Sequence, residues 1–241
     1  MSKNAAAGAN GGRASLRDRM PAPDPALREG AAAGATEADA LSEAFFDARV
    51  EELRSRVGKR RFEHSLSVAK TAEGLARVYG ADEQLARLAG MLHDWDKGYN
   101  DDGIRARTEE LGLAAELSSY LGMPHLLHGP TAAAALGRAF PGLPAEVLSA
   151  IRLHTTGAVG MSALDMIVYT ADAIEPGRDY PGIAELRALV GKVTLEELFL
   201  STFQHVLENL VQRRKRIHPD TVTVWNHYVA RARERAARGD S

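Results

Sequence analysis

The stretch Leu92-His93-Asp94-Trp95-Asp96-Lys97 places an imidazole and a carboxylate side by side at the end of an apolar segment. Apolar residues precede it at helical spacing, at Leu85, Leu88 and Ala89, so the pair is expected at the end of a helix. An imidazole and a carboxylate suit a borderline or hard divalent metal, and an apolar wall would raise the cost of leaving either group unpaired. A histidine that stabilises a helix C-terminus would also explain the pair. Residues elsewhere in the sequence are needed to choose between these two interpretations.

The composition is ordinary for a globular protein and contains no sulfur ligand from cysteine. Of 241 residues, 45% are hydrophobic and 26% are charged, and none is cysteine. Any metal must therefore be held by His, Asp, Glu and water, which favours iron, manganese, cobalt or magnesium. The net charge of -2 gives no overall field that would attract duplex nucleic acid. No apolar run reaches the roughly 18 residues of a membrane-spanning helix, so we expect a cytoplasmic protein without a membrane partner.

The amino-acid composition and the hydrophobic pattern divide the chain into three parts. Residues 1–40 are rich in Ala, Gly, Pro and charged residues, so ordering them would cost backbone entropy with little burial, and we expect a disordered tail. Residues 41–235 carry apolar stripes at helical spacing and no convincing strand, which predicts one all-α domain. Residues 236–241 are expected to be a disordered C-terminus.

Helix boundaries are marked by capping residues and by Gly or Pro. Asp82 is a predicted N-cap, and Ser162 with Asp165 resembles a capping box. Pro130 suits the first position of a helix, which would leave His128 just outside it. The expected helices cover approximately 41–57, 62–79, 82–93, 104–111, 114–121, 130–140, 144–154, 163–174, 183–190 and 194–213, with a last helix after Pro219.

Four histidines lie at predicted helix ends or beside loops, and an aspartate interrupts an apolar helix. Each of His64, His93, His128 and His154 could by itself be structural. Asp172, however, sits in an apolar run, where a carboxylate without a partner is expensive. Together these residues indicate a site that binds a cation.

The order His64, His93-Asp94, Asp172 resembles that of the HD superfamily of metal-dependent phosphohydrolases. A closer resemblance is to the bacterial YqeK family, and the run Tyr169-Thr170-Ala171-Asp172-Ala173-Ile174-Glu175-Pro176-Gly177-Arg178 is its most specific part. Asp96 departs from the family pattern, in which a small residue is expected, and adds negative charge near the site. The other matching segments are Arg61 with His64-Ser65, Leu92 to Lys97, His128-Gly129, His154-Thr155 with Gly157 and Met161, and Ile217 to Thr221.

This resemblance implies a single HD-domain helical bundle that hydrolyses diadenosine tetraphosphate symmetrically and releases two ADP. By the same resemblance, His64, His93, Asp94 and Asp172 would ligate a divalent metal, iron first, with manganese or cobalt as substitutes. Asp94 is the candidate catalytic residue, which would orient or deprotonate the attacking water. The alternative for Asp94 is that it is only a metal ligand.

The remaining candidate residues are expected to bind the substrate. His128 and His154 are expected to contact phosphate, and a second metal held by this pair is the alternative. Arg178 offers a planar cationic fork to phosphate oxygens, whereas Lys97 could contact phosphate or pair with Asp96. Thr155, His218 and Thr221 complete the expected nucleotide contacts, the last two at a helix start that suits an anion.

Two other functions are compatible with the same residues. The chain could be an HD phosphohydrolase of another nucleotide, such as a dNTP or a cyclic nucleotide. It could also be a nucleotide-binding regulatory HD protein that no longer turns over. In the leading interpretation the partner is a small dinucleoside polyphosphate, and a homodimer is possible.

Overall fold

The computed structural model describes residues 36–239. The predicted N-terminal tail, as far as residue 35, and the last two residues of the predicted C-terminal tail lie outside the described residues. Within residues 36–239 the secondary structure is helical and no strand is present, so the predicted all-α class is confirmed. No helix in this part of the chain combines the length and the apolar character needed to cross a bilayer.

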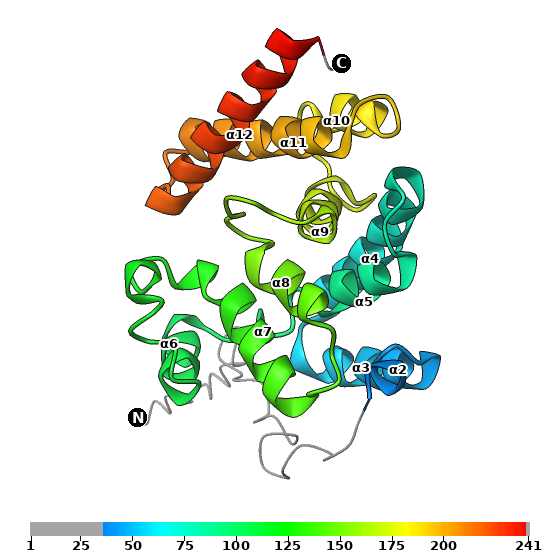
Figure 1. The fold of residues 1–241 in the computed structure, drawn as a ribbon. Helices are drawn as coiled ribbons and strands as arrows, with labels where there is room; N and C mark the ends of the chain where they lie inside the picture. The colour runs from blue at the N-terminus through cyan, green and yellow to red at the C-terminus, as the bar shows by residue number, and fades with distance from the viewer. Residues whose placement is uncertain (1–35, 240–241) are drawn as a thin grey trace, which may run out of the picture.

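Long helices make up most of the fold, with two short 3-10 turns between α6 and α7 (Figure 1). In chain order they are α2 (Glu37–Ala40), α3 (Glu43–Arg56), α4 (Lys59–Tyr79), α5 (Glu83–Leu92), α6 (Asp101–Glu110), η2 (Ser118–Tyr120), η3 (Pro124–Leu126), α7 (His128–Ala139), α8 (Ala145–Leu153), α9 (Ala163–Ile174), α10 (Ile183–Leu189), α11 (Leu195–Gln212) and α12 (Pro219–Arg238).

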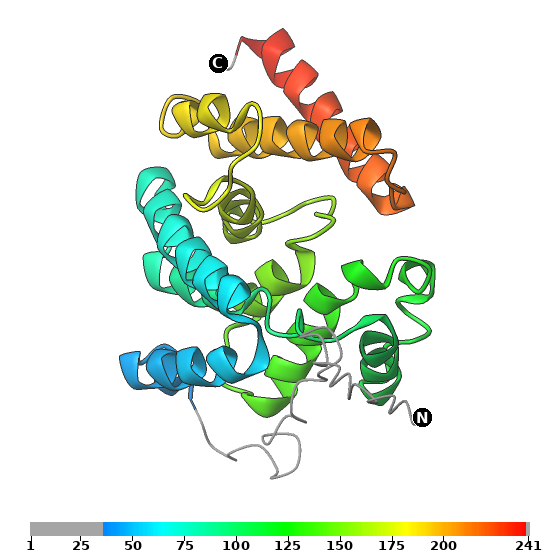
Figure 2. The same cartoon turned by 180° about the vertical axis from the view of Figure 1, so that it is seen from behind.

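Helix α9 lies at the centre of the arrangement. It packs against α4, α5 and α8 on one side and against α11 on the other, and α12 crosses α11 at the far end (Figures 1 and 2). Its apolar residues face both neighbours: Ile167 and Val168 are fully buried in the larger core, while Tyr169 packs against Phe199 and Phe203 of α11. The helix that carries Asp172 is therefore fixed from two sides.

Gly90 permits the close contact between α4 and α5. A Cβ atom at this position would lie 2.9 Å from the Cα atom of Ala69, which is too close for any other residue. Since α5 ends two residues later, this contact sets the position of His93 relative to α4, which carries His64. The glycine thus links helix packing to the geometry of the His-Asp pair.

Most of the predicted boundaries are confirmed, and the differences have local causes. Asp82 accepts hydrogen bonds from the backbone of α5, and Ser162 forms the predicted capping box. Helix α7 begins at His128, not after it, because the first-turn N–H groups of a helix have no partner and Pro130 is tolerated there. Helix α12 continues to Arg238 because its Ala and Arg residues favour helix. Residues 37–40, expected in the tail, form α2 under a Thr36 capping box.

The predicted helix over 114–121 is wrong in element type. Only Ser118–Tyr120 adopts a 3-10 turn there, and the preceding residues form turns. Serines compete for backbone hydrogen bonds, and Gly112 and Gly122 flank a segment too short to offset the cost of starting an α-helix.

Asp96, the departure from the family pattern, is part of a buried ion cluster. Its side chain is fully buried, with Oδ1 3.1 Å from Nη2 of Arg56 and Oδ2 3.5 Å from Nε of Arg107. Arg56 also donates to the Trp95 carbonyl oxygen at 3.3 Å and lies over the Trp95 ring. The negative charge of Asp96 is therefore balanced by two arginines, one at the end of α3 and one in α6. These ion pairs hold the turn after α5 against both helices.

Replacement of Asp96 by alanine should lower the free energy of unfolding by about 3–5 kcal/mol, because it leaves two buried guanidinium groups without the carboxylate between them. Urea denaturation of the metal-free protein, followed by circular dichroism, measures the change. Asp102→Ala is the matched control, since the Asp102 side chain is 99% exposed and its pair with Arg105 is at the surface. Equal losses in the two variants would contradict a stabilising role for the Asp96 cluster.

Candidate metal centre

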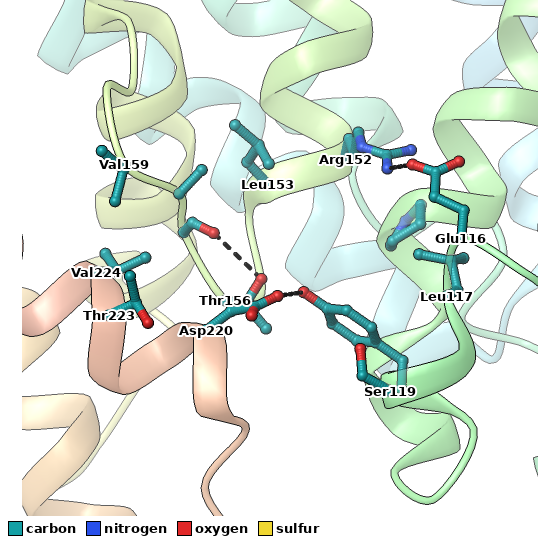
Figure 3. Close-up of a pocket in the computed structure, with 14 residues that line it drawn as sticks. Glu116, Leu117, Ser119, Arg152, Leu153, Thr156, Val159, Asp220, Thr223 and Val224 are labelled. Carbon is teal, nitrogen blue, oxygen red and sulfur yellow. Dashed lines mark hydrogen bonds and ion pairs between the residues drawn. The ribbon is translucent and has the colours of Figure 1, made fainter.

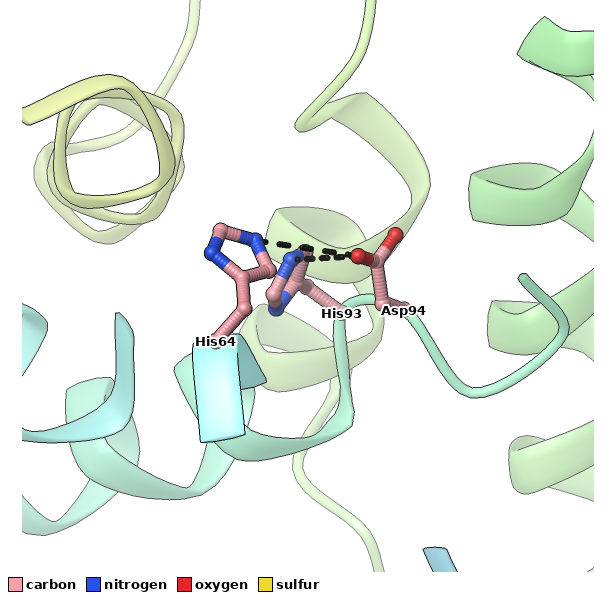
Figure 4. Close-up of side chains that lie close together, drawn as sticks. All are labelled: His64, His93 and Asp94. Carbon is pink, nitrogen blue, oxygen red and sulfur yellow. Dashed lines mark ion pairs between the residues drawn. The ribbon is translucent and has the colours of Figure 1, made fainter. Parts of the chain in front are cut away.

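Five helices converge to bring four imidazoles and two carboxylates together. His64 comes from the second turn of α4, and His93 and Asp94 follow the last turn of α5. His128 opens α7, His154 caps the end of α8, and Asp172 lies near the end of α9. Figure 4 shows the side chains of His64 and His93 pointing toward the Asp94 carboxylate.

One oxygen of Asp94 faces His64 and His93. Asp94 Oδ2 lies 3.2 Å from His93 Nε2 and 3.8 Å from His64 Nε2. Asp172 Oδ1 lies on the same side, 3.0 Å from His64 Nε2 and 3.9 Å from His93 Nε2. The four predicted metal ligands therefore form one cluster of nitrogen and oxygen donors.

The other oxygen of Asp94 faces His128 and His154. Asp94 Oδ1 lies 3.1 Å from His128 Nε2 and 3.8 Å from His154 Nε2, and these two nitrogens are 2.9 Å apart. Gly129 allows this approach, because a Cβ atom there would lie 3.0 Å from the Ile151 carbonyl oxygen and 3.2 Å from the His154 ring. Asp94 thus stands between two groups of donors.

Each imidazole is held in place through its Nδ1 atom. The acceptor is the carbonyl oxygen three residues earlier for His93, His128 and His154, at 2.7, 2.8 and 2.7 Å. For His64 it is the Glu175 carboxylate, at 3.1 Å. Because these oxygens only accept, each Nδ1 carries a proton, and a ring in its neutral form then presents its Nε2 lone pair to the cluster, as a metal ligand must.

The donor set fits a divalent metal. The Nε2 atom of His93 is buried and has no hydrogen-bond partner within the described part of the chain, which would be costly for a nitrogen that bound nothing. His64, His93 and Asp94 offer ligand atoms within 4.8 Å of one another, as do Asp94, His128 and His154. Imidazole and carboxylate donors without thiolate suit iron, manganese or cobalt.

The electrostatics favour ionised carboxylates. Burial acts to raise the pKa of Asp94, but His93 and His128 outweigh it and hold that pKa well below its usual range. Burial also acts to raise the pKa of Asp172, but the nearby His64, His93 and Arg178 outweigh it and lower that pKa.

The buried imidazoles of His93, His128 and His154 differ in the direction of their pKa shifts. Burial and the nearby Lys97 lower the pKa of His128 to about 4, and burial beside His128 and His93 lowers that of His154. Burial acts in the same direction on His93, but Asp94 outweighs it and raises its pKa. At neutral pH, His128 and His154 are therefore neutral donors.

A cationic cleft opens onto the cluster. It has a volume of about 740 Å³. Its lining includes four cationic side chains, two carboxylates and an imidazole, from Lys59, Arg60, Arg61, Arg178, Glu63, Glu175 and His64. Arg61 Nη1 lies 2.7 Å from Asp94 Oδ2, and Arg178 Nη2 lies 2.5 Å from Asp172 Oδ1. Both arginine side chains are about one third exposed, so they connect the buried Asp94 carboxylate and the partly exposed Asp172 carboxylate to the open cleft.

A second pocket lies beside the end of α8 (Figure 3). It has a volume of about 330 Å³, and its walls include Leu153, Thr156 and Val224. The Tyr120 hydroxyl donates to Asp220 at 2.8 Å, and both residues line the pocket. The pocket combines apolar walls with an aromatic ring and hydroxyl groups.

The predicted substrate residues are divided between these regions. Lys97 reaches the cluster, with Nζ 3.3 Å from both ring nitrogens of His128, and so does not form the alternative pair with Asp96. His218 stacks on Tyr120 at 3.9 Å and caps α12, and Thr221 is buried in the first turn of that helix. Thr155 has a buried hydroxyl without a hydrogen-bond partner among the described residues.

Arg61, Glu175 and Tyr120 belong to these regions but were not predicted as site residues. Glu175 is 2% exposed and hydrogen-bonds His64; its sequence signals are its place in the run Tyr169 to Arg178 and its position directly after an apolar helix. Tyr120 follows two serines in a segment predicted to be helical, which carries no signal for a pocket.

Comparisons with known proteins place the chain in a family. The HD domain family model matches residues 61–177. The symmetrical bis(5'-nucleosyl)-tetraphosphatase of Halalkalibacterium halodurans is 33% identical over 174 residues, which cover 72% of this chain and 91% of that protein. The protein of the same name from Staphylococcus aureus is 34% identical over 177 residues, covering 73% of this chain and 90% of its own length.

A solved structure agrees with these relatives. The crystal structure of an HD superfamily hydrolase from Clostridium acetobutylicum, described as involved in NAD metabolism, has a TM-score of 0.71 and 33% identity, and the similarity covers 77% of this chain and 97% of that one. The fold, the order of the His and Asp residues and these relatives agree with the predicted resemblance. The chain belongs to the HD-domain family of symmetrical bis(5'-nucleosyl)-tetraphosphatases.

Proposed function

We propose that this protein hydrolyses diadenosine tetraphosphate symmetrically to two ADP and that it requires a divalent metal, with iron as the first candidate. The observation that carries the proposal is Asp94, whose two oxygens face two separate groups of imidazoles at the base of a cationic cleft. The relatives named for this reaction support the choice of substrate.

The first ion would be held by His64, His93, Asp94 and Asp172. A divalent ion at that position would supply positive charge against the phosphate oxygens and make a water acidic enough to provide hydroxide at neutral pH. In the overall reaction, water oxygen forms a bond to the phosphorus beside the central bridging oxygen, the bond to that bridging oxygen breaks, and ADP leaves.

A second ion would be held by His128 and His154 with Asp94. Their Nδ1 atoms donate to carbonyl oxygens, so two Nε2 lone pairs face each other at 2.9 Å. This contact is repulsive unless a proton or a cation lies between the nitrogens, and their lowered pKa values disfavour the proton at neutral pH. These observations favour a second metal over the direct phosphate contact that we expected for this pair.

The protein's own side chains would bind and orient the phosphates. Arg61 and Arg178 reach from the carboxylates into the cleft, so their guanidinium groups can contact phosphate oxygens on either side of the cleaved bond. Lys97 adds a partly buried point charge next to His128. The low pKa of Asp94 makes it a weak base, which favours its role as a ligand over that of general base.

The pocket of Figure 3 is the candidate position for a nucleoside. Tyr120 offers an aromatic face, and the walls near Leu153 and Val224 are apolar, which suits a base that stacks. Leu153 directly precedes His154, so this pocket adjoins the cluster through the end of α8. On the α12 side this pocket is lined by Asp220, Thr223 and Val224, whereas His218 and Thr221, for which nucleotide contacts were expected, are buried and do not line it.

Purified protein incubated with diadenosine tetraphosphate and Mn²⁺, Co²⁺ or anaerobic Fe²⁺ should yield ADP as the only nucleotide product. Anion-exchange chromatography separates ADP from ATP and AMP. Asp94→Asn should abolish turnover, because it removes the charge that both donor groups share, while circular dichroism shows that the fold is retained. Asp102→Asn, at an exposed position, should be as active as the unmodified protein.

Different products would separate the competing functions. ATP together with AMP would contradict symmetrical cleavage. Hydrolysis of a dNTP or a cyclic nucleotide in place of diadenosine tetraphosphate would support the other phosphohydrolase. Tight ADP binding without turnover in any of these metals would support the regulatory protein.

The second-metal proposal predicts two Mn²⁺ ions per chain and one ion in His154→Ala, because the variant keeps the four ligands of the first ion. Elemental analysis after equilibrium dialysis measures the stoichiometry. His125→Ala is the matched control, since the His125 side chain is exposed and only its carbonyl oxygen, which the substitution keeps, accepts from His128. A single ion in the unmodified protein, unchanged in His154→Ala, would favour direct phosphate contact.

A further inference from the structure

We propose that Glu175 is a positioning residue of the metal centre, which orients His64 as a ligand and ties it to the loop that carries Arg178. The inference rests on the metal site proposed above. It concerns a residue that contacts the metal ligand His64 without being a ligand itself, and it explains why an acidic side chain is buried at the end of an apolar helix.

His64 differs from the other three imidazoles in what holds it. The other three rings donate to a carbonyl oxygen of the same chain segment, three residues earlier. His64 lies within α4, where the carbonyl oxygens are occupied by the helix, and its Nδ1 donates to Glu175 Oε1 at 3.1 Å. A charged acceptor fixes the ring orientation and makes Nε2 more electron-rich than a neutral carbonyl would.

The second oxygen of Glu175 holds the following loop. Glu175 Oε2 accepts the backbone N–H of Gly177 at 2.6 Å. A Cβ atom on Gly177 would lie 2.9 Å from Oε2 and 3.0 Å from Oε1, so the carboxylate fits against this residue because it is glycine. The segment Glu175-Pro176-Gly177 thus forms a tight loop that folds around the Glu175 carboxylate.

This loop places Arg178 over Asp172. The Arg178 side chain donates from Nε to the Asp172 carbonyl oxygen at 2.8 Å and from Nη2 to the Asp172 carboxylate. Arg187 of α10 supports the loop from behind, through hydrogen bonds to the carbonyl oxygens of Glu175 and Arg178 at 2.6 and 3.0 Å. One buried carboxylate therefore connects a metal ligand with an arginine that faces the phosphate cleft.

Glu175 is buried, and the hydrogen bonds described above stabilise its carboxylate. Its side chain is 3% exposed. Burial acts to raise its pKa, but hydrogen bonds from Ser67, His64 and Gly177 lower it, so the carboxylate is ionised. A neutral amide of the same shape cannot satisfy both His64 and Gly177, because both donate and the amide has only one acceptor oxygen.

The test is the affinity for Mn²⁺ of Glu175→Gln in the full chain, measured by competition with a chromophoric chelator. The expected result is a dissociation constant raised about 10- to 100-fold at the site that contains His64. Glu185→Gln is the matched control, since Glu185 is exposed on α10 and should leave the affinity unchanged. The melting temperature of each metal-free variant shows whether the fold is retained.

A double-mutant cycle with His64→Ala distinguishes positioning from a general structural effect. If Glu175 acts through His64, Glu175→Gln should change the remaining affinity less than about 2-fold in the His64→Ala protein. An equal loss in both backgrounds, or an unchanged affinity in Glu175→Gln alone, would overturn the proposal.

The readout also separates this inference from the proposed reaction. Metal binding without hydrolysis of diadenosine tetraphosphate would contradict the proposed function and still allow the affinities to decide the role of Glu175. Hydrolysis with unchanged affinity in Glu175→Gln would overturn the positioning role alone. A chain that binds no divalent metal would overturn both.

Discussion

The charge of Asp94 is the constraint on which the rest of the site depends. Its side chain is almost fully buried at the end of an apolar helix, and an isolated carboxylate there would be very costly. The fold offsets this cost because it brings His93, His128 and Arg61, from three separate helices, to the two carboxylate oxygens of Asp94. The helix ends therefore converge at this point both because the helices pack together and because the buried charge of Asp94 needs their polar side chains.

The ends of helices also explain how the imidazoles are oriented. The last carbonyl oxygens of a helix lack partners within it, so a histidine just beyond the last turn can donate to the carbonyl three residues earlier. His93 and His154 use this geometry at the ends of α5 and α8, and His128 uses it after the short turn η3. Each ring gains a fixed direction without a second side chain. His64, inside a helix, lacks this possibility, which is why a carboxylate from another helix is needed.

The sequence predicted the parts of the fold that depend on local spacing. Apolar periodicity and capping residues identified α4, α5, α8, α9 and α11, and the His and Asp pattern with the family resemblance identified the six residues that meet at the cluster. Their contacts could not be predicted, because they join residues far apart in the chain: His64 and Glu175 are separated by 111 positions. The segment 114–121 was misassigned because its helical spacing is weak and its glycine-flanked ends set the outcome.

Asp94 and Asp96 show how two neighbouring carboxylates can have different roles in the same turn. Both are buried, but Asp94 faces the imidazoles whereas Asp96 faces Arg56 and Arg107. Burial raises the pKa of Asp96 and the two arginines offset this only in part, while the pKa of Asp94 falls well below its usual range. Because the charge of Asp96 is balanced on the side of α3 and α6, it adds little to the field at the cluster. Asp96 therefore attaches this turn to α3 and α6 and leaves the donor set for the metal intact.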